Sequence, residues 1–231
     1  MAELAPCRPT MRLRRSTPIG LPTDAIRKRA DYLVTPSGEL RMAPLLAAMS
    51  LELDPMASTE IRRRTGLDIV CVVLGGALRY EPEGAPGVTL GTEGVAVVST
   101  GAGVDYRWRS VGNEPALAMM FWLLGKTRGA PRIDVRIARR VERLREAAAI
   151  AGRGTSLPTS RDVRILARVV PVGGSVVHCV RGRRCYVLST IGRITADGIA
   201  AGAGDGVMID RTGAVRVCAK ESTEIVIIET P

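Results

Sequence analysis

Short apolar runs, each bounded by glycine, proline or aspartate, form the main pattern along this chain. The runs are rich in valine and isoleucine and recur at hairpin-like intervals, which is typical of β-strands. They lie at 67–74, 94–98, 116–124, 163–171, 175–180, 185–190, 206–209, 214–218 and 224–229. Turn-forming residues gather at 81–87, 92–94, 197–198 and 204–206. The pattern predicts an all-β fold of the barrel or sandwich type.

One segment has helical spacing instead. Ile133, Ile137, Val141 and Leu144 follow one another at spacings of 4, 4 and 3 residues, which places them on one face of a helix ending near Gly152. The strand pattern repeats on the two sides of this segment, because strands close at 75–78 and again at 191–194, and each is followed by a further apolar strand. The sequence therefore predicts two related barrels joined by a helix.

Several segments resemble the pirin family. Residues 62–78, RRRTGLDIVCVVLGGAL, resemble the pirin segment in which two histidines, one residue apart, precede a long apolar strand and a Gly-Ala-Leu turn. Residues 99–109, STGAGVDYRWR, resemble the pirin segment whose histidine and glutamate complete the iron site. The motifs at 182–187, 192–195 and 203–206 resemble the carboxy-terminal cupin of pirin-like bicupins related to the quercetinases.

The resemblance implies a bicupin, that is, two tandem cupin barrels of the double-stranded β-helix, jelly-roll type with a linking helix. We expect an N-terminal extension over 1–40 that joins the barrels, an N-terminal cupin over 41–126, a helical linker over 127–160 and a C-terminal cupin over 161–231. In the family the second cupin carries no metal, so we expect the functional pocket in the first.

The family's metal ligands are replaced in this chain. Arg62 and Arg64 stand at the positions of the two histidines, and Tyr106 and Trp108 stand at those of the histidine and the glutamate. A cupin metal needs neutral imidazoles and a carboxylate directed at one point, whereas two cations repel a divalent ion. Paired arginines instead favour a carboxylate, phenolate or enolate. We therefore expect no metal and no other cofactor.

The one histidine of the chain, His178, lies in the second half, beside Cys179. We interpret it as a hydrogen-bonded strand residue. A zinc site of His178, Cys179 and Cys185 is the alternative, although the ligand spacing is irregular. The five cysteines include no Cys-x-x-Cys pair and are interpreted as reduced thiols.

Strand alternation predicts the lining of the pocket. If Arg62 and Arg64 point into the barrel, the same alternation continued along the next strand predicts that Asp68, Val70 and Val72 also point inward. If positions 106 and 108 point inward, the strand at 116–124 faces them. The predicted substrate-binding residues are Arg62, Arg64, Val70, Val72, Trp108, Met120 and Trp122. An apolar chamber with a few convergent polar groups is typical of a small-ligand site.

Within that pocket the predicted catalytic residues are Tyr106, Asp68 and Arg64. The arginine would stabilise developing negative charge, the tyrosine would donate a proton and the aspartate would act as a base. Core packing is the alternative for each aromatic or methionine side chain, and pairing with Asp68 is the alternative for the arginines.

The composition favours some kinds of binding partner over others. The net charge is +10, from 33 basic and 23 acidic residues; the basic residues are scattered along the chain without a nucleic-acid motif, and aromatic residues are 3% of the chain. The pattern favours an anionic or aromatic small molecule over nucleic acid. No apolar run reaches the roughly 18 residues that span a bilayer, and the start of the chain lacks a secretory signal. We expect a cytoplasmic monomer or homodimer without membrane contact.

Three functions fit these residues. The first is a metal-independent enzyme, of cyclase, isomerase or dehydratase type, acting on a small apolar or aromatic, anionic metabolite. The second is a non-catalytic protein that senses a ligand or contacts a protein partner. The third is a quercetinase-like dioxygenase, which the replaced ligands disfavour.

Overall fold

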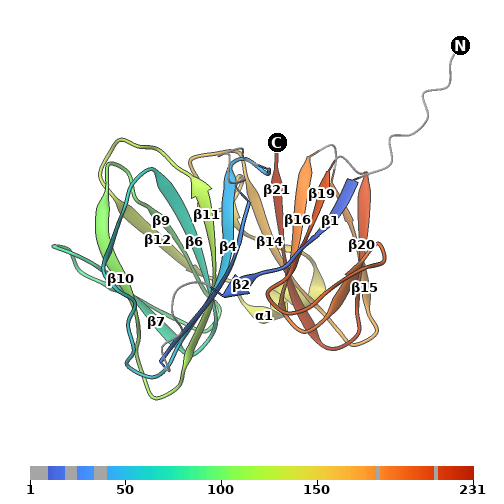
Figure 1. Ribbon diagram of the computed structural model, residues 1–231, viewed down its shortest axis with the longest axis horizontal. Helices are drawn as coiled ribbons and strands as arrows, with labels where there is room; N and C mark the ends of the chain where they lie inside the picture. The colour runs from blue at the N-terminus through green and yellow to red at the C-terminus, as the bar shows by residue number, and fades with distance from the viewer. Residues whose placement is uncertain (1–9, 19–24, 34–40, 181–182, 211–212) are drawn as a thin grey trace, which may run out of the picture.

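The computed structural model describes residues 10–18, 25–33, 41–180, 183–210 and 213–231, which form two β-barrels side by side (Figure 1). The prediction of an all-β fold with two tandem barrels is confirmed. Residues 1–9, 19–24 and 34–40 of the predicted N-terminal extension, and residue 182 of the second-half motif, lie outside the described residues. No helix in the described part of the chain is long and apolar enough to cross a membrane.

The first barrel consists of a seven-stranded sheet, in the order β12-β9-β6-β11-β4-β3-β2, and a four-stranded sheet, in the order β5-β10-β7-β8. The strands are β2 (Thr17–Pro18), β3 (Ile26–Tyr32), β4 (Leu45–Leu53), β5 (Arg62–Arg64), β6 (Leu67–Gly75), β7 (Ala77–Pro82), β8 (Val88–Gly91), β9 (Gly94–Ser99), β10 (Val104–Ser110), β11 (Ala116–Leu124) and β12 (Arg132–Ile137).

The second barrel consists of a six-stranded sheet, β1-β19-β16-β21-β14-β13, and a four-stranded sheet, β15-β20-β17-β18. The strands are β1 (Thr10–Arg14), β13 (Ala148–Gly152), β14 (Arg164–Val170), β15 (Ser175–Cys179), β16 (Arg184–Ile191), β17 (Ile194–Ala196), β18 (Ile199–Ala201), β19 (Gly206–Asp210), β20 (Ala214–Ala219) and β21 (Thr223–Thr230). The beginning of the chain contributes to both barrels, since β1 pairs with β19 whereas β3 pairs with β4.

The seven-stranded sheet is apolar on both faces. On β6, Ile69, Cys71 and Val73 face the interior of the first barrel, whereas Val70 and Val72 face the second barrel. A strand buried on both faces has a continuous apolar sequence without alternation. This explains the unbroken run at 67–74, and it also means that the sequence of β6 does not reveal which residues face the pocket.

The segment between the barrels differs from the predicted helix. Residues Arg132–Ile137 form β12, which pairs with β9 at the edge of the sheet, and the helix α1 covers only Arg140–Arg145. Ile133, Val135 and Ile137 are β-branched and alternate at a spacing of two, so the same residues also fit a strand. Pairing with the free edge of β9 decided between the two patterns, and the prediction of a helix from Ile133 onward is wrong.

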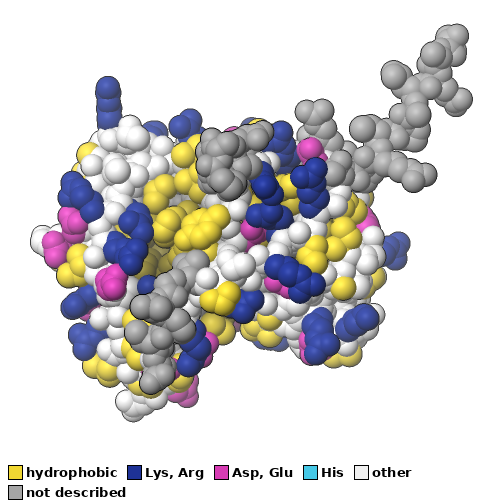
Figure 2. All heavy atoms as spheres, in the orientation of Figure 1, with side chains coloured by type: hydrophobic (Ala, Val, Ile, Leu, Met, Phe, Trp, Pro, Cys, Tyr) yellow, Lys and Arg dark blue, Asp and Glu magenta, His cyan; other side chains and the backbone are white. Residues whose placement is uncertain are grey.

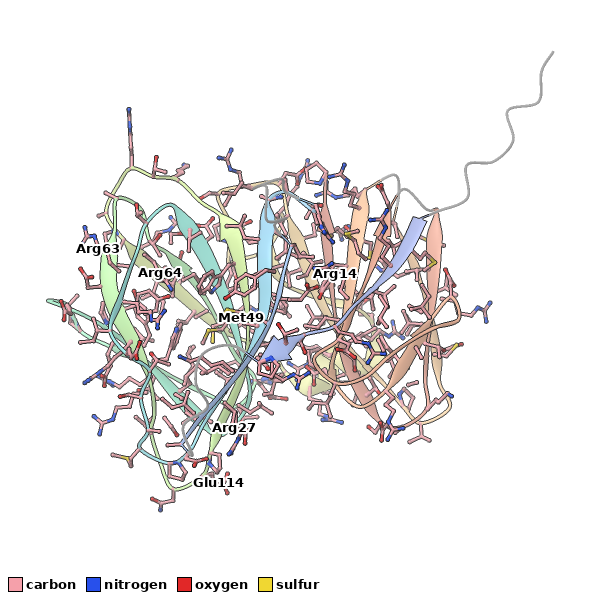
Figure 3. All side chains as sticks on the ribbon, viewed as in Figure 1. Arg14, Arg27, Met49, Arg63, Arg64 and Glu114 are labelled. Carbon is pink, nitrogen blue, oxygen red and sulfur yellow. The ribbon has the colours of Figure 1, made fainter. Side chains whose placement is uncertain are left out.

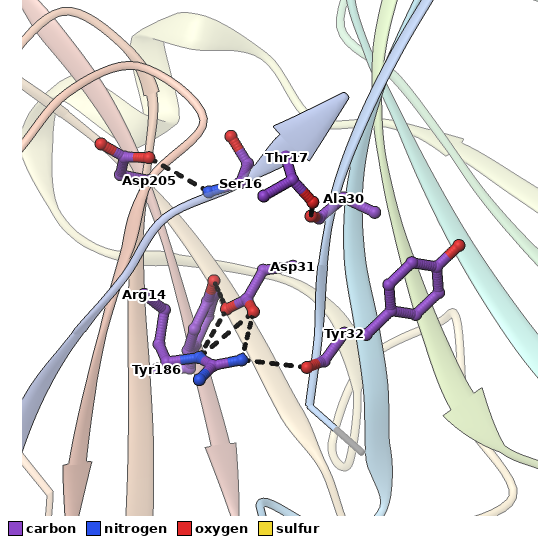
Figure 4. Close-up of polar contacts among 8 residues, drawn as sticks. All are labelled: Arg14, Ser16, Thr17, Ala30, Asp31, Tyr32, Tyr186 and Asp205. Carbon is purple, nitrogen blue, oxygen red and sulfur yellow. Dashed lines mark hydrogen bonds and ion pairs between the residues drawn. The ribbon is translucent and has the colours of Figure 1, made fainter. Parts of the chain in front are cut away.

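A buried carboxylate joins the two barrels. Asp31 on β3 is 3% exposed; its Oδ2 accepts a hydrogen bond from the Tyr186 hydroxyl of β16 at 2.9 Å, and its Oδ1 accepts one from Arg14 Nη2 of β1 at 2.7 Å (Figure 4). Arg14 also donates to the carbonyl oxygen of Tyr32 at 3.0 Å. These bonds fix β3, and with it one wall of the first barrel, against the second barrel.

Candidate functional site

A cavity of about 370 Å³ lies in the first barrel, between its two sheets. It is lined by Lys28, Tyr32, Met49, Leu51, Thr59, Glu60, Arg62, Arg64, Tyr106, Trp108, Met120 and Trp122. Figure 2 shows hydrophobic side chains gathered on this face of the first barrel, with Lys and Arg side chains beside them. In Figure 3, Arg64 and Met49 lie within the first barrel and Arg63 lies at its edge. The cavity combines an apolar lining with a small number of charged groups.

The short strand β5 directs two of its three arginines to the cavity. Arg62 Nη2 pairs with Glu60 Oε2 at 2.7 Å, and both side chains are more than half exposed. The Arg64 guanidinium carbon lies 5.0 Å from the centroid of the Trp122 ring, a cation–π contact. Arg63 points away and pairs with Asp105 at 2.7 Å. Arg62 thus belongs to the rim, whereas Arg64 covers an aromatic surface.

The four-stranded sheet contributes an aromatic cluster. The ring centroids of Tyr80 and Tyr106 are 5.1 Å apart, and those of Tyr80 and Trp108 are 5.2 Å apart. In the pairing of β10 with β5, Tyr106 lies directly opposite Arg62. Burial raises the pKa of Tyr106 above the ordinary value, and the nearby charge of Arg64 only partly opposes this. The Tyr106 hydroxyl therefore keeps its proton at neutral pH.

Six of the residues predicted for the pocket line this cavity: Arg62, Arg64, Tyr106, Trp108, Met120 and Trp122. They come from β5, β10 and β11, which belong to two different sheets. Their roles in binding and catalysis remain predictions.

Asp68, Val70 and Val72 lie elsewhere, and their predicted placement in the pocket is wrong. The two valines pack in the core between the barrels, and the buried Asp68 carboxylate accepts a hydrogen bond from the backbone N–H of Ser160. Alternation does not carry over from β5 to β6, because Gly66, with φ of +65°, turns the chain between strands of different sheets. The predicted base is therefore absent from the cavity.

Other lining residues were missed by the sequence reasoning. Lys28 and Tyr32 come from β3, and Met49 and Leu51 come from β4. The segment that contains β3 resembles the family only weakly, so no motif pointed to it. The signal that could have found Lys28 is the alternation Ile26, Lys28, Ala30 along one face of a strand.

Lys28 is the charged residue on this wall of the cavity. Partial burial lowers its pKa, and the charge of Arg62 lowers it further; Glu60 raises it by less than either of these, and Arg64 adds a small lowering effect. Three cations, Lys28, Arg62 and Arg64, thus surround one cavity with a single carboxylate on its lining, that of Glu60.

The donor set of the cavity does not fit a metal ion. Its charged groups are an ammonium, two guanidiniums and the Glu60 carboxylate, which is already paired with Arg62. Divalent cupin metals need imidazole and carboxylate ligands directed at one point. Among the described residues no group of three or more His, Cys, Asp and Glu side chains could hold a metal ion.

The interpretation of His178 as a hydrogen-bonded strand residue is confirmed. Its Nε2 lies 2.8 Å from Glu229 Oε1, and Arg164 Nη1 lies 3.0 Å from Glu229 Oε2. Cys185 is buried and Cys179 is exposed. The alternative zinc site of His178, Cys179 and Cys185 is not formed within the described chain.

The comparisons with known proteins agree with this architecture. Residues 147–230 match the family described as the quercetinase C-terminal cupin domain. No curated protein matches the sequence significantly. The bacterial pirin YhhW from Escherichia coli, solved in complex with nickel(II), has a TM-score of 0.81 and 15% identity, covering 96% of this chain and 99% of that chain.

Two further solved structures are similar over most of their length. Quercetin 2,3-dioxygenase from Acinetobacter baumannii has a TM-score of 0.76 and 13% identity, covering 94% of this chain and 84% of that chain. The protein YhaK from Escherichia coli has a TM-score of 0.73 and 23% identity, covering 94% and 93%. The family match thus assigns residues 147–230 to the quercetinase C-terminal cupin domain, and the chain as a whole shares the two-barrel fold of these bacterial pirin and dioxygenase structures.

Proposed function

We propose that the first barrel binds a planar organic anion, such as an aromatic carboxylate, a phenolate or an enolate, and converts it without a metal ion in a cyclase-, isomerase- or dehydratase-type reaction. The observation that carries the proposal is Arg64. Its guanidinium covers the Trp122 ring and makes no ion pair with a described carboxylate. A planar anion would supply both the missing counter-charge and a surface that packs on the aromatic lining.

The lining also offers a proton donor and a cation for such a reaction. Tyr106 keeps its proton because burial raises its pKa, so it can donate that proton to a substrate. Arg62 lies opposite Tyr106 in the β5–β10 pairing, where it can stabilise negative charge that develops during the reaction. Trp108 and Trp122 hold the ring system between the two sheets.

Binding without turnover is the second candidate, and the position of Asp68 favours it. With Asp68 in the contact with Ser160, the carboxylate on the cavity lining is that of Glu60, and Glu60 is paired with Arg62 and exposed. A cavity without a free carboxylate base is compatible with a sensor of the same planar anion.

The two tryptophans of the chain are built-in reporters, because both line the cavity. Chelator-treated protein is titrated with 4-(hydroxymethyl)benzoate and, as the neutral control, 1,4-benzenedimethanol, while tryptophan fluorescence is recorded. Quercetin, which absorbs light itself, is titrated by calorimetry. Saturable quenching by the carboxylate and not by the neutral alcohol is expected. Equal quenching by both compounds would refute an anion site.

Turnover is tested separately from binding. Compounds that bind are incubated with the chelator-treated protein, and the mixture is followed by mass spectrometry and NMR. Product that forms with the wild type and is lost in Tyr106→Phe supports the enzyme. Binding with no product from any bound compound supports the sensor instead.

A further inference from the structure

Lys28 is an unusual residue for this chain. The sequence contains 33 basic residues, of which only Lys28, Lys126 and Lys220 are lysine. Lys126 and Lys220 are exposed, whereas Lys28 is partly buried and lines the cavity of the first barrel. A guanidinium serves an anion site at least as well as an ammonium does, but only the lysine amine can become a nucleophile. The choice of lysine at this position is therefore informative.

The amine of Lys28 is available for chemistry. Among the described residues it makes no hydrogen bond or ion pair, since the neighbouring Glu60 carboxylate is bound by Arg62 at 2.7 Å. The titratable groups that face it are Arg62 and Arg64 of β5, Glu60 before β5, Tyr106 of β10 and Tyr32 on its own strand. The other lining residues of the neighbouring β4 and β11 do not titrate. Burial and the two arginines lower the pKa of Lys28, which raises the share of the reactive neutral amine.

The strand register places Lys28 away from the Arg64–Trp122 contact but along the same wall. In the β3–β4–β11 pairings, Tyr32, Ala47 and Trp122 form one row, and Lys28 lies four residues further along β3. Four residues of a strand span about 13 Å, part of which the lysine side chain itself covers. A planar molecule with its acid group at Arg64 can therefore extend toward the Lys28 amine.

From this placement we propose that Lys28 captures the carbonyl group of a planar aldehyde or ketone acid as an imine. The inference rests on the anion site proposed above and names its substrate class. The neutral Nζ attacks the carbonyl carbon, and the carbonyl oxygen takes up a proton, for which Tyr106 is the donor on the lining. One of the two nitrogen protons returns to Tyr106, and the carbinolamine then loses its hydroxyl group together with the second nitrogen proton as water, which leaves C=N. The step needs no oxidant or reductant.

The test uses the full chain with 4-formylbenzoate as the probe and cyanoborohydride to reduce any imine to a stable amine. Peptide mapping then compares Lys28, Lys126, Lys220 and the N-terminal amine. We expect Lys28 to be labelled at least about tenfold faster than the others, because anchoring by Arg64 raises the local concentration of the aldehyde. Excess 4-(hydroxymethyl)benzoate, which cannot form an imine, should protect Lys28.

Two variants distinguish imine formation at Lys28 from binding of the anion at Arg64. Lys28→Arg keeps the charge and removes the nucleophilic amine, so it should show no label at position 28 while still binding 4-(hydroxymethyl)benzoate more tightly than Arg64→Ala does. Arg64→Ala keeps the amine and should reduce the labelling of Lys28 to the level of Lys126. Thermal denaturation confirms that both variants are folded.

The outcomes are distinguishable. If 4-(hydroxymethyl)benzoate binds but Lys28 is labelled no faster than Lys126 and Lys220, the imine inference is wrong and the anion site stands. If that compound does not bind and the lysines label equally, the anion site and the inference built on it both fail.

Discussion

Replacing Tyr186 by phenylalanine removes one oxygen atom from the contact between the barrels. The hydroxyl donates to the buried Asp31 carboxylate at 2.9 Å, and Asp31 keeps its ion pair with Arg14 in the variant. A hydrogen bond to a charged group contributes about 1.5–3 kcal/mol. For a chain of this size each kcal/mol corresponds to about 2–4 °C, so the loss should lower the melting temperature by roughly 3–12 °C.

Tyr80→Phe is the matched control, because Tyr80 is also buried but its hydroxyl makes no hydrogen bond to a described residue. Both variants and the wild type are compared by urea denaturation and calorimetry at neutral pH. Tyr80→Phe should change stability by less than about 0.5 kcal/mol. If Tyr186→Phe were no more destabilising than Tyr80→Phe, the Asp31 contact would not hold the barrels together as described.

Two further predictions concern the second barrel. A Cβ on Gly206 would overlap the Tyr186 ring, so Gly206→Ala should lower the free energy of unfolding in urea by about 1–3 kcal/mol. A Cβ on Gly213 would face open space, so the control Gly213→Ala should leave this free energy nearly unchanged. Burial raises the pKa of Glu229, but the His178 hydrogen bond and the Arg164 charge outweigh it and leave the pKa lowered. Because its folded-state pKa is lowered, ionised Glu229 stabilises the fold at pH values above the ordinary glutamate pKa of about 4.3, and this stabilisation is lost as the pH falls through the folded-state pKa. Glu229→Gln should therefore flatten the decline of the urea midpoint on the acid side. An unchanged decline would contradict this assignment.

The strand pattern predicted the fold class well, because glycine and proline turns between β-branched runs depend on local geometry. It could not settle the segment before α1, where Ile133, Val135 and Ile137 satisfy a strand and, in part, a helix. Only the free edge of β9 distinguishes these, and an edge is a property of the assembled sheet.

The candidate site was likewise predicted where local geometry decides the position of a residue, and not where the assembled sheets decide it. Arg62 and Arg64 were placed correctly because both lie on one short strand, where alternation holds. Asp68 was misplaced because Gly66 lies between two sheets, so the alternation begins anew after it. Lys28 was missed because its segment resembles the family only weakly, so nothing in the sequence assigned its strand to this wall, which it joins by pairing with β4.

The central claim is that Arg64 anchors a planar anion in a barrel that needs no metal, and calorimetric titration of chelator-treated protein with 4-(hydroxymethyl)benzoate tests it most directly. Arg63→Ala is the control of equal charge, since Arg63 is on the same strand but pairs with Asp105 at the edge. Loss of one charge-assisted contact of about 1.5–3 kcal/mol should weaken binding roughly 10- to 150-fold in Arg64→Ala, with Arg63→Ala close to the wild type. Equal affinities in the two variants, or binding that requires added metal ions, would contradict the account.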